Sequence, residues 1–195
     1  MSDIIENLSQ ANLESSTYAE TSPSPAIFRA YDVRGVADTQ LTTDVIYVVA
    51  RAIASDALEQ GINSLYFGFD GRNSSPALSH AAIEGILSTG CNVINIGLVP
   101  SPVLYFATHA LAHSSGVILT ASHNPANYNG LKILFRRTSL TAQQIQNLRL
   151  RIQEKRLLNG IGSYQEISVN QLYVNDICGR ISLSRPMRVV VDCGN

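Results

Sequence analysis

Hydrophobic positions change their spacing several times after residue 26, which indicates a domain of short strands and amphipathic helices. Short apolar runs predict strands at 64–69, 92–98, 116–121, 131–135 and 187–191. Apolar residues that recur every three or four positions predict helices at 43–59, 75–90, 101–111, 141–155 and 169–181. Because the two kinds of element alternate, we expect an α/β fold: a three-layer α/β/α domain with a mixed, mostly parallel sheet.

Two local signals refine this prediction. The predicted strands at 116–121 and 131–135 are too close in sequence for a helical crossover, so we expect them to be antiparallel, with a turn at Asn129-Gly130. Thr141 followed by Gln144 predicts a capping box at the start of the helix that follows.

The composition changes at both ends of the chain. Residues 1–26 are rich in Ser, Thr, Glu and Asn and are expected to form a disordered N-terminal tail, since they offer little apolar surface to bury. The predicted strand at 187–191 is apolar on both faces, as strands buried between two layers of helices are. We therefore expect one domain over 27–184 and the start of a second domain, continued elsewhere, at 185–195.

Composition also excludes several classes of partner. The chain has 195 residues, 45% of them hydrophobic, and a formal net charge of −1, so no basic excess is available for a nucleic acid or an anionic membrane. Its three cysteines form no CxxC pair, which argues against a disulfide framework and a structural zinc site. No apolar run is long enough for a membrane span. We expect a cytoplasmic protein with neither nucleic acid nor membrane as partner; the oligomeric state stays open.

The segment from residue 120 to 132 concentrates groups that can perform chemistry. It leaves an apolar strand and contains the Ser122 hydroxyl, the His123 imidazole, the Asn124 amide and the Lys132 ammonium. An open α/β sheet places reactive groups in such loops. The serine lacks the GxSxG context of a hydrolase, and the segment lacks the GxxxxGK[ST] pattern of a P-loop.

Four segments, in this order, resemble motifs of one enzyme superfamily. They read FRAYDVRG at 28–35, GFDGR at 68–72 followed by Ser74-Ser75, GLVPSP at 97–102 and TASHNP at 120–125. The chain resembles the α-D-phosphohexomutases, and FRAYDVRG is more similar to the phosphomannomutase/phosphoglucomutase branch than to phosphoglucosamine mutases, which typically open with a stretch like FGTDGIRG.

The resemblance covers about residues 28–195 and implies the first of four domains, the one that supplies a phosphoserine. It implies an isomerase of carbohydrate metabolism that interconverts hexose 1-phosphate and hexose 6-phosphate through a phosphoserine enzyme and a bisphosphate intermediate. The family's metal-binding, sugar-specificity and phosphate-binding loops have no match in these residues. The resemblance therefore implies that the fragment alone is inactive, and a phosphosugar-binding remnant or a phosphoglucosamine mutase remains as an alternative.

Site residues follow from the same resemblance. Ser122 matches the phosphoryl carrier, Lys132 the lysine that helps to move the hydroxyl proton, and His123 a further catalytic position. Arg34 matches a basic residue facing the phosphoserine, while Asn124 and Tyr31 match groups that bind substrate or phosphate. Asp70 and Arg72 form either a supporting turn or a direct part of the site, and the residue pattern leaves both open.

The resemblance also implies cofactors. Mg²⁺ would bind the phosphate carried by Ser122, with its other ligands beyond Asn195. Glucose 1,6-bisphosphate, or the mannose analogue, would activate the enzyme, and hexose phosphates would be its substrates.

Overall fold

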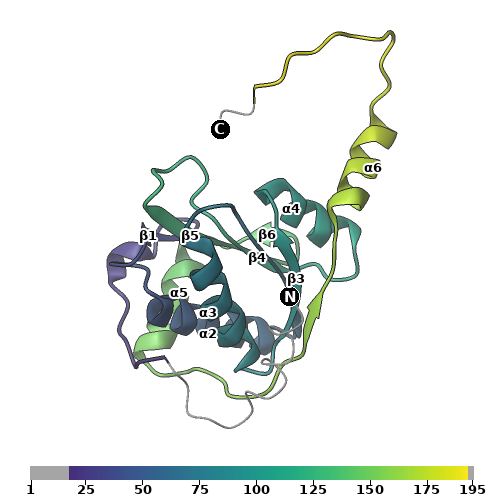
Figure 1. Cartoon of the computed structure of the whole chain (residues 1–195). Coiled ribbons are helices and arrows are strands. Elements are labelled where there is room, and N and C mark those ends of the chain that lie inside the picture. The colour runs from purple at the N-terminus through teal and green to yellow at the C-terminus, as the bar shows by residue number, and fades with distance from the viewer. Residues whose placement is uncertain (1–17, 193–195) are drawn as a thin grey trace, which may run out of the picture.

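A mixed sheet forms the middle layer of the molecule (Figure 1). The computed structural model describes residues 18–192. Among them the sheet has seven strands in the order β1-β5-β4-β2-β3-β7, with β6 beside β5. The strands are β1 (Val33–Val36), β2 (Ser64–Phe69), β3 (Asn92–Leu98), β4 (Gly116–Leu119), β5 (Tyr128–Phe135), β6 (Thr138–Ser139) and β7 (Tyr164–Glu166).

Helices cover both faces of this sheet. After the short 3-10 helix η1 (Pro25–Ile27), they are α2 (Thr43–Glu59), α3 (Ser75–Leu87), α4 (Ser101–Ala110), α5 (Ala142–Gln153) and α6 (Asn170–Arg180). Helices α2, α3 and α5 bury their apolar faces with one side of the sheet around Phe67. On the other side α4 packs around Ile118, and Tyr173 of α6 joins that cluster. The predicted three-layer α/β/α class is confirmed.

Strand direction explains why the sheet is mixed. Strand β2 is parallel to β3 and β4, and β7 is parallel to β3. Strand β5 is antiparallel to β1, β4 and β6, so among the described strands it alone runs the opposite way. The predicted antiparallel pairing of strands 116–121 and 131–135, here β4 and β5, is therefore confirmed.

Helix boundaries follow the sequence signals closely. Helix α2 begins after Thr42, whose side chain accepts a hydrogen bond from the Val45 amide. Helix α5 has the predicted capping box: the side chain of Thr141 accepts from the amide of Gln144, and the side chain of Gln144 accepts from the amide of Thr141. These caps satisfy amides that the first helical turn leaves without a partner.

The predicted turn at Asn129-Gly130 is wrong, because both residues lie inside β5. The chain reverses earlier, between β4 and β5. A Cβ on Gly130 would lie 2.3 Å from the Val33 carbonyl oxygen, so glycine is needed here for close strand packing rather than for a turn. Strands β1, β6 and β7 are also absent from the sequence prediction.

The β5–β6 turn contains two arginines in the left-handed region, Arg136 at φ 48° and Arg137 at φ 70°. Their side chains extend to helices on opposite faces of the sheet. Arg136 Nη2 donates to the carbonyl oxygen of Gln60 after α2, and Arg137 Nε donates to that of Thr108 in α4 at 3.2 Å. Both bonds satisfy carbonyl groups near helix C-termini, where positive charge is favourable.

The N-terminal segment differs in part from the expected tail. Most of residues 1–26 lie outside the described residues, but from Tyr18 onward the chain packs against the domain. The Tyr18 ring stacks on Tyr47 of α2, with ring centroids 4.3 Å apart, and its hydroxyl donates to the carboxylate of Glu84. Burial, and next this hydrogen bond, raise the pKa of Tyr18 well above its ordinary value. This aromatic stacking stabilises an ordered position for Tyr18, although the polar composition of the segment predicts disorder.

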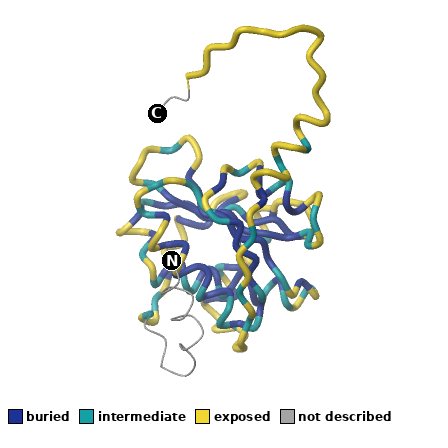
Figure 2. Tube along the Cα trace, turned by 45° about the vertical axis from the view of Figure 1, so that its right-hand side comes forward, coloured by how far each residue is buried: buried dark blue, intermediate teal, exposed yellow. Residues whose placement is uncertain are grey.

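The predicted strand at 187–191 does not form, so this expectation is wrong for the structure described. After α6 the chain is exposed, and it rises from the helix and curves back above the domain without joining the sheet (Figure 2). Val190 is 98% exposed. A strand needs a neighbour for its backbone hydrogen bonds, and no segment of residues 18–192 supplies one here. Whether a second domain begins at 185 remains a prediction.

Two of the three cysteines lie in the described part, and both are free thiols. Cys91 is fully buried, and burial raises the pKa of its thiol to about 12. Cys91 is therefore an uncharged core residue at neutral pH. Among residues 18–192 no helix is both long and apolar enough to cross a bilayer.

Helices α2 and α3 pack closely against each other at Gly85, and this contact gives a test of the packing. A Cβ there would lie 2.5 Å from the Tyr47 carbonyl oxygen, whereas a Cβ on Gly179 in α6 would meet nothing within 4 Å. We expect Gly85→Ala to lower the free energy of unfolding by about 1–3 kcal/mol through overpacking. Gly179→Ala, the matched control, gains helix propensity and leaves stability unchanged or up to about 1 kcal/mol higher. Urea denaturation measures both, and equal effects would contradict the packing described.

Candidate active site

The site lies where β2 and β4 end, because parallel neighbours bring their C-terminal ends to one edge of the sheet. The loop after β4 (residues 120–127) contains the exposed Ser122, and the loop after β2 contains Asp70 and Arg72. Ser122 has φ 53°, a left-handed conformation that costs a non-glycine residue about 1–3 kcal/mol. The surrounding contacts must therefore hold it.

Arg72 gathers the backbone of the serine loop. Its Nη2 donates to the carbonyl oxygens of Ser122 at 2.7 Å and Asn124 at 2.9 Å. Its Nη1 donates to the carbonyl oxygens of Pro125 at 2.6 Å and Tyr128 at 3.1 Å. The Arg72 side chain is only 12% exposed, and its bonds to Tyr128 and Asn124 are partly buried, whereas those to Ser122 and Pro125 lie at the surface. Arg72 therefore fixes the backbone of this loop, and whether it also takes a direct part in the chemistry stays a prediction.

Asp70 connects Arg72 to the serine from the other side. Its Oδ2 accepts from Arg72 Nε at 3.2 Å and from the Thr120 hydroxyl at 2.7 Å. Thr120 Oγ1 in turn accepts from the Ser122 amide at 2.9 Å. Asp70 Oδ1 accepts from the Ser75 hydroxyl at 2.8 Å, which joins the network to the start of α3. Both carboxylate oxygens of Asp70 are thus engaged.

Arg34 places a buried cation beside the same loop. It is 6% exposed and lies in β1, where its Nη1 donates to the carbonyl oxygen of Ala121 at 3.2 Å. Its Nη2 forms an ion pair with Asp32 at 2.5 Å. Its Nε is buried and has no hydrogen-bond partner among the described residues.

Lys132 lies on the same face of the sheet as Arg34. The register of β4 and β5 pairs Lys132 with Ile118, and that of β1 and β5 pairs Arg34 with Gly130, two residues before Lys132. Partners across strands, and residues two apart within one, share a face. Ile118 belongs to the cluster under α4, which identifies the face. Lys132 is half-buried and forms no ion pair within the described part of the chain.

The remaining predicted residues are less tightly held. His123 is exposed, and its side chain forms no hydrogen bond within residues 18–192. The backbone of Asn124 is fixed by Arg72 and by its own amide, which donates to the carbonyl oxygen of Ala121 at 3.0 Å. Tyr31 is 62% exposed and contacts none of the other predicted site residues through a hydrogen bond.

Sequence reasoning missed three polar residues that this site depends on. Asp32 is 2% exposed and neutralises Arg34, Thr120 is 3% exposed and connects Asp70 to Ser122, and Asn129 is fully buried. Asn129 Nδ2 donates to the hydroxyls of Ser74 and Ser75, which ties β5 to the start of α3. Each of the three lies within or beside a motif, but only the fold shows that its side chain is buried with polar partners.

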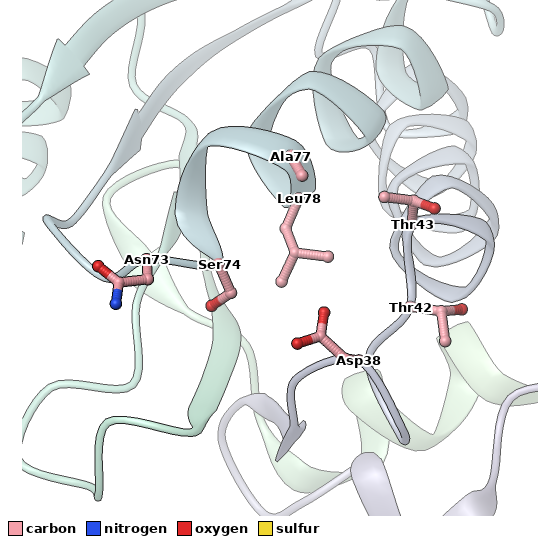
Figure 3. Close-up of a pocket in the computed structure, with 7 residues that line it drawn as sticks. All are labelled: Asp38, Thr42, Thr43, Asn73, Ser74, Ala77 and Leu78. Carbon is pink, nitrogen blue, oxygen red and sulfur yellow. The ribbon is translucent and has the colours of Figure 1, made fainter.

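A separate hollow of about 360 Å³ lies between the N-terminal ends of α2 and α3 (Figure 3). Its lining residues are Asp38, Thr42, Thr43, Asn73, Ser74, Ala77 and Leu78. Figure 3 shows the Asp38 carboxylate pointing toward Leu78 across this space. The hollow contains none of the predicted site residues and has a negative charge without a cation in its lining, so it is poorly suited to a phosphate.

The described residues also limit what metal chemistry can be placed here. Residues 18–192 contain no group of three or more His, Cys, Asp and Glu side chains arranged to hold a metal ion. Asp70, the carboxylate joined to the serine loop, has both oxygens occupied by protein donors.

Comparisons with known proteins agree with this architecture. Residues 25–158 match the family model described as "Phosphoglucomutase/phosphomannomutase, alpha/beta/alpha domain I". A "Phosphomannomutase/phosphoglucomutase" of Pseudomonas aeruginosa is 45% identical over 181 residues, which are 93% of this chain and 39% of that protein. A "Phosphoglucomutase" of Neisseria meningitidis serogroup A is 41% identical over 87% of this chain and 37% of its own length.

Solved structures give the same result. A phosphoglucomutase/phosphomannomutase family protein from Burkholderia thailandensis superposes with a TM-score of 0.81 at 38% identity, over 84% of this chain and 38% of that one. The chain thus spans about two fifths of the length of the curated relatives that it matches.

The buried pair of Asp32 and Arg34 gives a prediction about stability. Asp32→Ala leaves a buried guanidinium without its counter-ion, and we expect it to lower the free energy of unfolding by about 3–5 kcal/mol. The double variant Asp32→Ala with Arg34→Met, which removes the charge as well, should lose less. Chemical denaturation compares the two, and a double variant as unstable as the sum of its single changes would contradict the pairing.

Proposed function

Because the chain belongs to the phosphoglucomutase/phosphomannomutase family, we propose that it supplies the phosphoserine part of a phosphohexomutase. The protein that carries it interconverts hexose 1-phosphate and hexose 6-phosphate. The observation that carries this proposal is the exposed Ser122, held in a strained conformation at the sheet edge beside the buried cation of Arg34.

The proposed reaction moves one phosphoryl group in each half. In the first half the bond between phosphorus and Ser122 Oγ breaks as a bond from phosphorus to a hexose phosphate hydroxyl forms, which gives a hexose 1,6-bisphosphate. After the bisphosphate has turned round, Ser122 Oγ takes the other phosphoryl group, and the isomeric monophosphate leaves. Atoms and charge balance over the two halves, because Ser122 carries a phosphoryl group both at the start and at the end.

Each half needs positive charge near phosphorus and a place for a proton. Arg34, whose Nη1 donates to the carbonyl oxygen of Ala121 next to Ser122, supports the first role, since preorganised cationic groups stabilise charge that develops on phosphoryl oxygens. Lys132, on the same face and without an ion pair among residues 18–192, supports the second role by exchanging a proton with the sugar hydroxyl. His123, Asn124 and Tyr31 are exposed or half-exposed groups available to sugar and phosphate oxygens.

The described residues do not form a complete magnesium site. Phosphoryl oxygens on Ser122 are ligands that Mg²⁺ prefers, and the ion would supply Lewis-acid stabilisation when bound. No carboxylate cluster among residues 18–192 completes its coordination. We therefore derive no step through the metal. The identity of the sugar and of the activating bisphosphate is proposed from family membership alone, because no described residue selects them.

Phosphorylation of one residue tests the proposal. The polypeptide that carries this sequence in its source is incubated with glucose 1,6-bisphosphate, and its intact mass and phosphopeptides are measured. We expect a single phosphoryl group on Ser122, its loss in Ser122→Ala, and no change in Ser139→Ala, an exposed serine of β6. A phosphoryl group on another residue would refute the assignment. A protein that binds the bisphosphate without labelling or turnover would favour the alternative of a phosphosugar-binding remnant.

Proton transfer gives a second prediction. Lys132→Met removes the proposed acid/base, and we expect turnover of glucose 1-phosphate to fall by about 100-fold or more in a coupled assay. The matched control is Lys155→Met, because Lys155 is exposed and pairs with Glu20 far from the serine loop. Equal turnover in the two variants would exclude Lys132 from the proton transfer.

A further inference from the structure

The left-handed backbone of Ser122 raises the question of what holds it there. At φ 53° a serine departs from the conformations that L-residues prefer, and such residues persist only where their surroundings fix them. Ser122 is exposed, so packing of its own side chain does not supply the restraint. The restraint must come from its backbone polar groups.

Both of these backbone groups lead to the loop after β2. On one side the Ser122 amide donates to Thr120 Oγ1 at 2.9 Å, and the Thr120 hydroxyl donates to Asp70 Oδ2 at 2.7 Å. On the other side the Ser122 carbonyl oxygen accepts from Arg72 Nη2 at 2.7 Å. Asp70 and Arg72 are themselves joined, so the serine peptide is held from both ends by one ion pair.

The guanidinium of Arg72 is fully used in this arrangement. An arginine has five N–H donors, and here one binds Asp70 while the other four bind the carbonyl oxygens of Ser122, Asn124, Pro125 and Tyr128. A lysine has three donors around a single nitrogen and cannot reproduce this fork. Asp70 is also tied to Ser75 at the start of α3, so the restraint rests on rigid elements.

We propose that Asp70, Thr120 and Arg72 are positioning residues for phosphoryl transfer: they hold the Ser122 backbone in its left-handed conformation and thereby aim its hydroxyl. This inference rests on the proposed function of Ser122. The same bonds turn loop carbonyl groups toward Arg72, and within the described chain the His123 amide has no acceptor. A donor therefore remains next to Ser122 for a phosphoryl oxygen.

A simple turn-stabilising role predicts a different outcome. If Arg72 only stabilises the fold, its loss lowers the unfolding temperature and the amount of active protein, while each folded molecule keeps its turnover number. If it positions the serine, folded molecules turn over slowly, with kcat reduced far more than KM is raised. Misplacement by about 1 Å costs a reaction of this kind about 100-fold.

The experiment compares Arg72→Lys with Arg51→Lys in the catalytically active polypeptide that carries this sequence. Arg51 is a matched control, because it also donates to a backbone carbonyl oxygen, that of Leu158, but far from the serine loop. We expect Arg72→Lys to lower kcat, and the rate of Ser122 phosphorylation by glucose 1,6-bisphosphate, by about 100-fold with KM nearly unchanged. Arg51→Lys should keep the wild-type kcat. Circular dichroism and thermal unfolding confirm that both variants are folded.

A second pair of variants covers the case in which Arg72→Lys fails to fold. Thr120→Val removes only the hydroxyl between Asp70 and Ser122, whereas Thr120→Ser keeps it. We expect Val to lower kcat and Ser to restore it. Wild-type kcat in folded Arg72→Lys or in Thr120→Val would overturn the positioning role while Ser122→Ala stays inactive. Full activity in Ser122→Ala would instead overturn the proposed function.

Discussion

Backbone carbonyl groups in a tight loop need donors, and in this molecule one guanidinium meets that need. The loop after β4 has few backbone hydrogen bonds of its own, because it belongs to neither a helix nor a strand. Without Arg72 its carbonyl groups would bind water, and the loop would sample many conformations. The presentation of Ser122 therefore depends on a residue of a different loop, fifty positions earlier in the chain.

The reversed direction of β5 completes the arrangement. Because β5 runs against its neighbours, the chain returns at once from the serine loop into the sheet beside β4. It then pairs with β1, and the two registers bring Lys132 and Arg34 to the same face. A helical crossover at this point would have carried the lysine to a distant strand. The sheet topology thus places positive charge near the serine at little additional structural cost.

The sequence predicts the regular elements well and the site contacts poorly, for a physical reason. Helices such as α2 and α5 carry their own signals, caps and a periodic apolar face, so local sequence determines them. Strand β1 has only four residues, including Arg34 and Gly35, and forms because of a partner about a hundred positions away. Asn129-Gly130 looks like a turn locally, but its side chain and its missing Cβ serve tertiary contacts.

The same limit holds for the site. Resemblance to a family identifies Ser122, Arg34 and Lys132 by position, and motif content identifies Asp70 and Arg72. Neither the resemblance nor the motif content shows that Thr120 connects Asp70 to the serine, or that Asp32 balances the charge of Arg34. Such links join residues far apart in sequence, and they exist only once the sheet has assembled.

The pairing of β1 with β5 has a consequence for how the chain folds. Strands β2, β3 and β4 follow one another with single helices between them, whereas Val33 must find Leu131 across most of the domain. Closing so long a loop costs chain entropy before any contact repays it, so this edge is expected to join the sheet late and to open first. Each brief opening would withdraw Arg34 from the serine loop and leave the remaining sheet intact. Local unfolding of four residues at the edge would then interrupt the charge balance around Ser122 long before the domain itself unfolds.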